Sequence, residues 1–255
     1  MTTKPSIYIA VPAFGGMIHA EFAQCLFGLC QRFAALQIPG TADILCGASN
    51  IAYARTTLAN RFLKSSFSHL LFLDADLVFT ADDVLKMIQA QKQVIALPYS
   101  RKAINWQTIQ QAVKAGAQPD LISQIASDLC VTLCEPNHQQ LKLDQPTQVR
   151  AIGCGVMLIA KEVFTKLSTS HPEWRCRIRL HDHEQEEAGF AFFNSVIDDE
   201  TGNLMSEDYS FCYEWRKVGG QVFMLPSAIT THIGQQKFVC NIAAMKALEQ
   251  AVAPR

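Results

Sequence analysis

The sequence has no long apolar run. Of its 255 residues, 49% are hydrophobic and 18% are charged, which is ordinary for a globular protein with a sizeable core. The apolar stretch that follows residues 1–5 is only of strand length, so it indicates neither a signal peptide nor a membrane-spanning segment. We therefore expect a cytoplasmic protein without a transmembrane segment, and peripheral association with a membrane stays open.

An excess of charge of either sign is also missing. The 22 basic and 23 acidic side chains give a formal net charge of −1, so no overall basic field favours nucleic acid as a partner. Internal repeats and linkers rich in glycine or serine are absent as well. We expect one continuous domain over residues 1–255.

Cysteine pairs and glycine-rich phosphate-binding motifs are the remaining absences. The nine cysteines are scattered without a C-x-x-C motif, so we expect reduced thiols, and Cys130 with Cys134 is a weak zinc signal at best. The turn after the first predicted strand matches neither G-x-G-x-x-G nor G-x-x-x-x-G-K-[ST]. It is therefore neither a dinucleotide fingerprint nor a P-loop.

The most informative stretch is Ser68–Phe79. Its consecutive apolar residues Leu70–Leu73 predict a short strand that is buried on both faces. Asp74 and Asp76 follow, and two charges at the end of a buried strand require a cation nearby. That cation is a divalent metal on a diphosphate in one interpretation, because ligands gather at the carboxyl ends of strands in α/β sheets. A helix cap and a surface salt bridge explain the two carboxylates equally well.

The first strand and the turn after it offer backbone contacts to a ligand. A strand over residues 6–11 and a helix over about 17–36 form the first half of a βαβ unit. Val11, Pro12 and Ala13 lie at the end of this strand, where their backbone can contact a base or a ribose. A plain strand-to-helix turn accounts for these residues as well.

A second helix, which runs to about Lys64, carries an inward-facing cation. Ser49 is expected to cap this helix, and Arg55 lies at the edge of its apolar stripe. A guanidinium in that position requires a carboxylate or a phosphate. A salt bridge to Asp74 or Asp76 and a contact with a ligand phosphate remain alternatives.

Glycines interrupt a later strand at Gly153-Cys154-Gly155. Glycine inside a strand indicates a bulge or the close approach of another group, and tight sheet packing is the alternative. We do not expect Cys154 to be a nucleophile, because the sequence places no base beside it.

Two acidic residues, Glu207 and Asp208, begin the last predicted helix before the final strand. Ser206 precedes them, and Gly219-Gly220 ends the helix. The helix dipole favours anions in a first turn by about 0.3–1 kcal/mol each, which is a sufficient structural reason for both. The functional alternative is that one of them meets an acceptor hydroxyl as a general base.

In combination, these motifs resemble the nucleotide-sugar half of a GT-A glycosyltransferase, close to the family 2-like enzymes of bacteria, phages and large algal viruses. The motifs that carry the resemblance are Ser49-Asn50, Ala54-Arg55, Phe72-Leu-Asp74-Ala-Asp76-Leu, Pro98-Tyr99-Ser-Arg-Lys102, Ser206-Glu207-Asp208-Tyr209 and His232-Ile-Gly234. They span about 50–100 and 150–235, which is most of the chain.

The resemblance implies an α/β fold of the GT-A class, in which helices flank a single Rossmann-like, mostly parallel sheet with a small antiparallel acceptor-side element. The nucleotide-sugar half would cover about 1–104, the acceptor half about 149–235, and a C-terminal helix 236–255. The implied activity is transfer of a hexose or deoxyhexose from a nucleoside-diphosphate sugar, usually a UDP-sugar, to a hydroxyl of a glycan or other acceptor. The implied cofactor is Mn²⁺ or Mg²⁺, and the implied context is polysaccharide biosynthesis.

The same resemblance assigns roles to individual residues. The implied metal ligands are Asp74, Asp76 and His232, and the implied catalytic residues are Asp208 and Glu207. The implied donor-binding residues are Val11, Pro12, Ala13, Ser49, Arg55, Asp74, Ala75 and Lys102, with Gly153, Cys154 and Gly155 as the floor below the transferred sugar.

Two stretches depart from the family pattern, the Gln-rich middle of the chain and the charged segment around residues 181–184. We expect the latter to be a loop that helps to select the acceptor rather than a metal site. A nucleotidyltransferase on a similar sheet and a non-catalytic nucleotide-sugar-binding module remain alternatives. The stereochemical outcome of transfer and the oligomeric state stay open.

Overall fold

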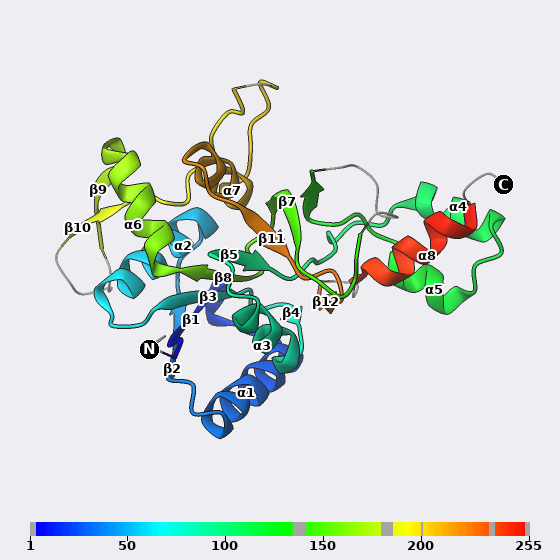
Figure 1. Ribbon diagram of the computed structural model, residues 1–255, viewed down its shortest axis with the longest axis horizontal. Coiled ribbons are helices and arrows are strands. Elements are labelled where there is room, and N and C mark those ends of the chain that lie inside the picture. Colours follow the sequence, from blue (N-terminus) through cyan, green and yellow to red (C-terminus); the bar gives the residue numbers. More distant parts are fainter. Residues whose placement is uncertain (1–3, 135–140, 180–185, 200, 235–237, 253–255) are drawn as a thin grey trace.

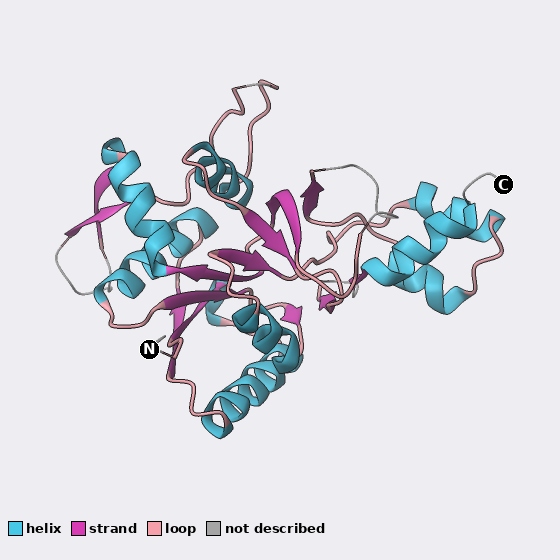
Figure 2. Ribbon diagram, viewed as in Figure 1, coloured by secondary structure: helices cyan, strands magenta, loops and turns pink. Residues whose placement is uncertain are grey.

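The computed structural model describes residues 4–134, 141–179, 186–199, 201–234 and 238–252 (Figures 1 and 2). The helices are α1 (Ala20–Ala35), α2 (Ile51–Lys64), α3 (Ala81–Gln89), α4 (Trp106–Lys114), α5 (Pro119–Ile125), α6 (Lys161–Ser170), α7 (Glu207–Lys217) and α8 (Ile242–Val252). None of these helices is both long and apolar enough to cross a membrane.

The strands form three sheets. They are β1 (Ile7–Ala13), β2 (Gly40–Cys46), β3 (His69–Leu73), β4 (Leu77–Val78), β5 (Val94–Ala96), β6 (Val131–Leu133), β7 (Thr147–Ile152), β8 (Val156–Ala160), β9 (Arg175–Ile178), β10 (Glu187–Phe190), β11 (Val222–Met224), β12 (Ile229–His232) and β13 (Phe238–Asn241). The central sheet has eight strands in the order β2-β1-β3-β8-β5-β11-β7-β6.

Most strands of the central sheet run in one direction. Strands β2, β1, β3, β5, β11 and β6 are parallel to one another, and β8 and β7 run the opposite way. Helices α1 and α3 lie together on one face, and α2, α6 and α7 lie on the other (Figure 1). The predicted α/β class, with a mostly parallel sheet between helices, is confirmed.

Strand β3 is the buried centre of the sheet, as its apolar run predicts. Leu70, Leu71, Phe72 and Leu73 have no exposed surface, because β3 lies between β1 and β8 and both of its faces are covered. The chain leaves this strand at Asp74 and forms β4 from Leu77, after three intervening residues. Strand β4 pairs with β12 in the small antiparallel sheet β13-β12-β4. This pairing places the segment after β3 beside residues 229–232, near the C-terminal end of the sequence.

Helices α4, α5 and α8 form a separate unit at one end of the molecule (Figure 1). Their own small apolar cluster consists of Ala112, Ile125, Ala244 and Leu248. The predicted C-terminal helix over 236–255 needs a correction, because β13 comes first and α8 begins at Ile242. The Asn241 side chain accepts a hydrogen bond from the Ala244 backbone N–H at 2.9 Å, and this capping bond sets the start of α8.

Three other helix starts differ in detail from the prediction. Asn50 rather than the exposed Ser49 caps α2, since its side chain accepts from the Tyr53 N–H at 3.1 Å. Helix α1 begins at Ala20, because a 3₁₀ turn over 14–16, with positive φ at both glycines, precedes it. Ser206 occupies the N-cap position of α7, but its hydroxyl donates to the Asp208 carboxylate instead of capping the backbone.

The end of α7 depends on two glycines. Gly219 has a φ of 82°, the left-handed conformation that ends many helices, and its N–H donates to the Arg216 carbonyl at 2.9 Å. At Gly220 a Cβ atom would lie 2.0 Å from Cε2 of the buried Trp215 side chain. Only glycine fits there without moving Trp215, and Trp215 anchors α7 in the core.

Two glycine-to-alanine substitutions are expected to change stability in opposite directions. Gly220→Ala forces Trp215 out of place and should lower the free energy of unfolding by about 1–3 kcal/mol. Gly28→Ala, in α1 with no atom within 4 Å of the new Cβ, should raise it by about 0.5–1 kcal/mol. Urea denaturation of both variants checks this, and a Gly220→Ala protein as stable as wild type would refute the packing argument.

Candidate functional site

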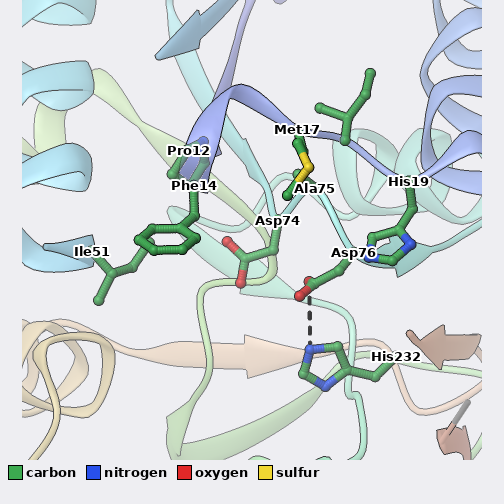
Figure 3. Close-up of a pocket in the computed structure, with 10 residues that line it drawn as sticks. Pro12, Phe14, Met17, His19, Ile51, Asp74, Ala75, Asp76 and His232 are labelled. Carbon is green, nitrogen blue, oxygen red and sulfur yellow. Dashed lines mark ion pairs between the residues drawn. The ribbon is translucent and has the colours of Figure 1, made fainter. Parts of the chain in front are cut away.

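A cavity of about 430 Å³ opens at the carboxyl ends of β1 and β3 (Figure 3). Its lining consists of Pro12, Phe14, Met17, Ile18, His19, Ile51, Asp74, Ala75, Asp76 and His232. A volume of this size is typical of a small-molecule site. The edge of the sheet at which it opens is the one where parallel α/β sheets bind ligands.

Backbone hydrogen bonds hold the two aspartates at the floor of this cavity. The Asp74 N–H donates to the Gly155 carbonyl at 2.7 Å, and the Leu77 N–H donates to the Asp74 carbonyl at 3.1 Å, so the chain turns directly after β3. The Ile233 N–H donates to the Asp76 carbonyl at 2.8 Å. This last bond continues the pairing of β4 with β12 and brings His232 from the far end of the chain to Asp76.

The Asp76 carboxylate contacts two cationic or basic side chains. His232 Nε2 lies 3.5 Å from Asp76 Oδ1 (Figure 3), and the Lys102 ammonium pairs with Oδ2. Burial alone would raise the pKa of Asp76. Hydrogen bonds and charge from His232 and Lys102 outweigh burial and lower the pKa to about 2, so Asp76 is an anion at neutral pH.

The tautomer of His232 follows from its second hydrogen bond. His232 Nδ1 lies 2.8 Å from the Ser100 carbonyl oxygen, which can only accept, so Nδ1 carries the proton. Nε2, on the other side of the ring, faces Asp76 Oδ1. A backbone carbonyl on one imidazole nitrogen is the arrangement that orients histidine ligands of metals in proteins.

Tyr99 supports the imidazole, and the Gly-x-Gly segment supports Tyr99. The rings of Tyr99 and His232 meet edge to face with 5.3 Å between their centroids. A Cβ on Gly153 would lie 2.0 Å from the Tyr99 hydroxyl oxygen, and a Cβ on Gly155 would lie 2.9 Å from Tyr99 Cε1. These glycines are therefore required for packing.

The segment Gly153-Cys154-Gly155 is fully buried and forms the turn between β7 and β8 rather than an interruption of one strand. Its role as the floor below a sugar stays a prediction. In this structure the Tyr99 ring packs against both glycines of the segment. Burial raises the pKa of the Cys154 thiol far above its ordinary value, which agrees with the expectation that it is not a nucleophile.

Arg55 forms a buried ion-pair cluster next to the cavity. One terminal nitrogen lies 2.9 and 3.0 Å from the two carboxylate oxygens of Asp74, and the other pairs with Glu207. The salt-bridge alternative for Arg55 is therefore the one that the structure contains. Arg55 is not part of the cavity lining, so its predicted contact with a donor phosphate has no direct route here.

The two acidic residues of α7 have different surroundings. Burial raises the pKa of Glu207, which is partly offset by the charge of Arg55. Asp208 Oδ1 accepts from the Ser206 hydroxyl and from the Tyr209 backbone N–H at 2.8 Å. Among the described contacts Asp208 Oδ2 has no donor, so it is the free acceptor of this pair.

The predicted metal ligands come together only in part. The described residues contain no group of three or more His, Cys, Asp or Glu side chains that could hold a metal ion. Asp76 and His232 meet, whereas Arg55 occupies both oxygens of Asp74. Of the predicted set Asp74, Asp76 and His232, the structure thus brings Asp76 and His232 into contact and pairs Asp74 with Arg55 instead.

The other predicted donor residues are distributed around the cavity. Pro12 and Ala75 line it, whereas Val11 and Ala13 are buried in β1. Ser49 is exposed and is outside the lining. The predicted acceptor loop at 181–184 lies outside the described residues.

Sequence reasoning missed the apolar wall of the cavity. Phe14 and Met17 are 71% and 72% exposed, and Ile51, the first residue of α2, is 41% exposed. Figure 3 shows all three side chains at the cavity that contains Asp74 and Asp76. The sequence did contain a signal for this apolar wall. Large apolar residues directly follow a predicted strand, in a turn that is too short to bury them.

No protein-family model and no curated protein sequence matches this chain. Among solved structures it is similar to A197 from STIV, with a TM-score of 0.50, 14% sequence identity, and coverage of 92% of this chain and 94% of that chain. At this identity the similarity concerns the fold alone.

Two further structures are more distant. One is GalNAc-T7 with UDP, GalNAc and Mn²⁺, at a TM-score of 0.44 and 12% identity over 92% of this chain and 45% of that chain. The other is 4-diphosphocytidyl-2C-methyl-D-erythritol synthase from Anaerococcus prevotii, at a TM-score of 0.36 and 10% identity over 84% of this chain and 96% of that chain. Neither similarity supports a conclusion about the chemistry of this chain.

Replacing Lys102 is expected to change the titration of Asp76. The ionised carboxylate stabilises the fold above its ordinary pKa, and this stability is lost as the pH falls through the native pKa of about 2. Lys102→Met removes one of the two groups that lower the pKa, so the pKa should rise toward its ordinary value and the loss of stability at acid pH should become shallower.

The measurement is a ¹³C NMR titration of the aspartate carboxyl groups. Lys86→Met is the matched control, because Lys86 pairs with Asp83 on α3 and should leave Asp76 unchanged. An Asp76 pKa that is the same in wild type and in Lys102→Met would contradict the assignment of Lys102 as its partner.

Proposed function

We propose that this chain is a metal-dependent glycosyltransferase that moves a sugar from a nucleoside-diphosphate sugar, probed first as a UDP-sugar, to a hydroxyl of a glycan or other acceptor. The observation that carries the proposal is the floor of the cavity. There an ionised Asp76 and the Nε2 atom of His232 meet below an apolar wall at the carboxyl end of the central strand, and the Lys102 ammonium pairs with Asp76.

The cavity offers complementary surfaces to the parts of a nucleotide. The exposed Phe14 ring provides a face on which a base can stack, and such stacking contributes about 1–3 kcal/mol per base. The Pro12 backbone at the end of β1 lies beside the space for the ribose. The Lys102 ammonium, which pairs with Asp76, is the cation that we assign to the phosphates.

Asp76 and His232 fit a divalent metal ion. A carboxylate with a low pKa and an imidazole nitrogen turned toward it are ligands that Mn²⁺ accepts, whereas Mg²⁺ prefers oxygen ligands alone. Two protein ligands leave positions for phosphate oxygens and water. When bound, the ion would neutralise charge that develops on the leaving diphosphate.

Asp208 is the candidate base for the acceptor. Its Oδ1 is held by Ser206 and by the Tyr209 N–H, so Oδ2 is oriented and free to take the proton of an acceptor hydroxyl. Attack of that oxygen on the anomeric carbon opposite to the leaving diphosphate would invert the configuration. Glu207 is less suited to the same task because Arg55 occupies it.

A nucleotidyltransferase has less support from the same residues. That reaction favours a cationic turn after the first strand to hold a nucleoside triphosphate. The turn over residues 14–19 has the sequence Phe-Gly-Gly-Met-Ile-His, and it contains no lysine or arginine.

Nucleotide binding is expected to require both a metal ion and Asp76. At a UDP concentration of 100 times Kd, binding stabilises the native state by about 2.7 kcal/mol, which is about 5–10 °C in Tm for a chain of this size. We expect this shift for wild type with Mn²⁺ and UDP together. Asp76→Asn should abolish the metal-dependent part, and Asp82→Asn, whose carboxylate pairs with Arg32 on the surface, should retain it.

The outcome of transfer assays separates binding from chemistry. Asp208→Asn should retain the shift with UDP and Mn²⁺ and should lower the rate of sugar transfer or donor hydrolysis by about 10²–10⁴-fold. Binding of UDP that needs neither the metal nor Asp76 would overturn the proposed function and favour a non-catalytic binding module.

A further inference from the structure

The guanidinium of Arg55 connects two parts of the molecule that are far apart in the sequence. Its side chain is 4% exposed, and its two partners are Asp74, at 20%, and Glu207, at 12%. Asp74 is the residue directly after β3 and lines the cavity. Glu207 is the first residue of α7, the helix that carries Asp208.

Nothing else among the described residues holds this guanidinium. Arg55 Nε is buried and has no hydrogen-bond partner there, so both terminal nitrogens depend on the two carboxylates. A buried cation must keep a counter-charge. Because both carboxylates hold the same guanidinium, removing the charge of one should displace the guanidinium and so weaken its hold on the other carboxylate.

We propose that Arg55 is a positioning residue that couples the nucleotide side of the site, at Asp74, to the start of α7 through Glu207. The coupling is inferred from the ion pairs alone. The description of the Asp74 side as the nucleotide side rests on the proposed function. Such coupling is reciprocal. Loss of the Glu207 charge should therefore destabilise the turn at Asp74, and loss of the Asp74 charge should destabilise the first turn of α7.

Amide hydrogen exchange measures both directions of this coupling without any ligand. The Leu77 N–H, which donates to the Asp74 carbonyl, reports on the turn after β3. The Ser210 N–H, which donates to the Ser206 carbonyl at 2.8 Å, reports on the first turn of α7. Glu207→Gln should accelerate exchange at Leu77, and Asp74→Asn should accelerate exchange at Ser210, each by about fivefold or more.

Asp43→Asn is the matched control. Asp43 pairs at 3.1 Å with Arg61, which belongs to the same helix α2, but its strand β2 lies at the edge of the sheet. Any general loss of stability should appear in this variant too. We expect unchanged exchange at Leu77 and at Ser210 in Asp43→Asn, after correction for global stability measured by urea denaturation.

Arg55→Lys tests whether the two-pronged guanidinium is required. A lysine ammonium keeps the positive charge but lacks the planar fork that reaches two carboxylates at once. In the Arg55→Lys background, Glu207→Gln should no longer accelerate exchange at Leu77. If either single acid variant fails to fold, the remaining one still tests its own direction.

Two results would overturn the coupling. The first is that the Leu77 amide in Glu207→Gln and the Ser210 amide in Asp74→Asn exchange no faster than they do in the Asp43→Asn control. The other is an acceleration that persists unchanged in the Arg55→Lys background. Because no nucleotide is used, these outcomes decide the coupling even if wild type binds no UDP, a result that would overturn the proposed function alone.

Discussion

A guanidinium buried in the interior of a protein must have counter-charges within hydrogen-bond reach, and Arg55 meets this requirement with two acids from different elements. Asp74 is thereby held at the end of the central strand, and Glu207 holds the first turn of α7 against it. Asp74 is thus paired with Arg55, whereas Asp76 is paired with Lys102 and faces His232. The two aspartates therefore have different partners although only one residue separates them.

A second chain of contacts sets the position of the imidazole. Glycines at 153 and 155 leave room for the Tyr99 ring, the ring packs against His232, and the Ser100 carbonyl accepts a hydrogen bond from His232 Nδ1. The residues that touch the cavity are thus oriented by buried residues behind them. Rigid support of this kind reduces the reorganisation that ligand binding requires.

The parts of the site that the sequence predicts are those set by local pattern. The apolar run Leu70–Leu73 and the acids after it identify the central strand and the end of it at which the cavity opens, and the helical stripe places Arg55 inward. Which anion Arg55 meets, and whether Asp74 binds a metal, depends on tertiary contacts that no local pattern contains. The same limit applies to the cap at Asn50 and to the exposed Phe14, because the choice between neighbouring residues is made by the fold around them.

The central claim is that Asp76 and His232 together hold a divalent ion against the diphosphate of a nucleotide. Crystals grown with UDP and Mn²⁺ and measured at the manganese absorption edge test it most directly. The account predicts one anomalous peak in contact with Asp76 and His232 Nε2, with Arg55 still on Asp74. An intact pair of Asp76 and Lys102 with no anomalous peak beside it, in crystals that contain ordered UDP, would contradict the account.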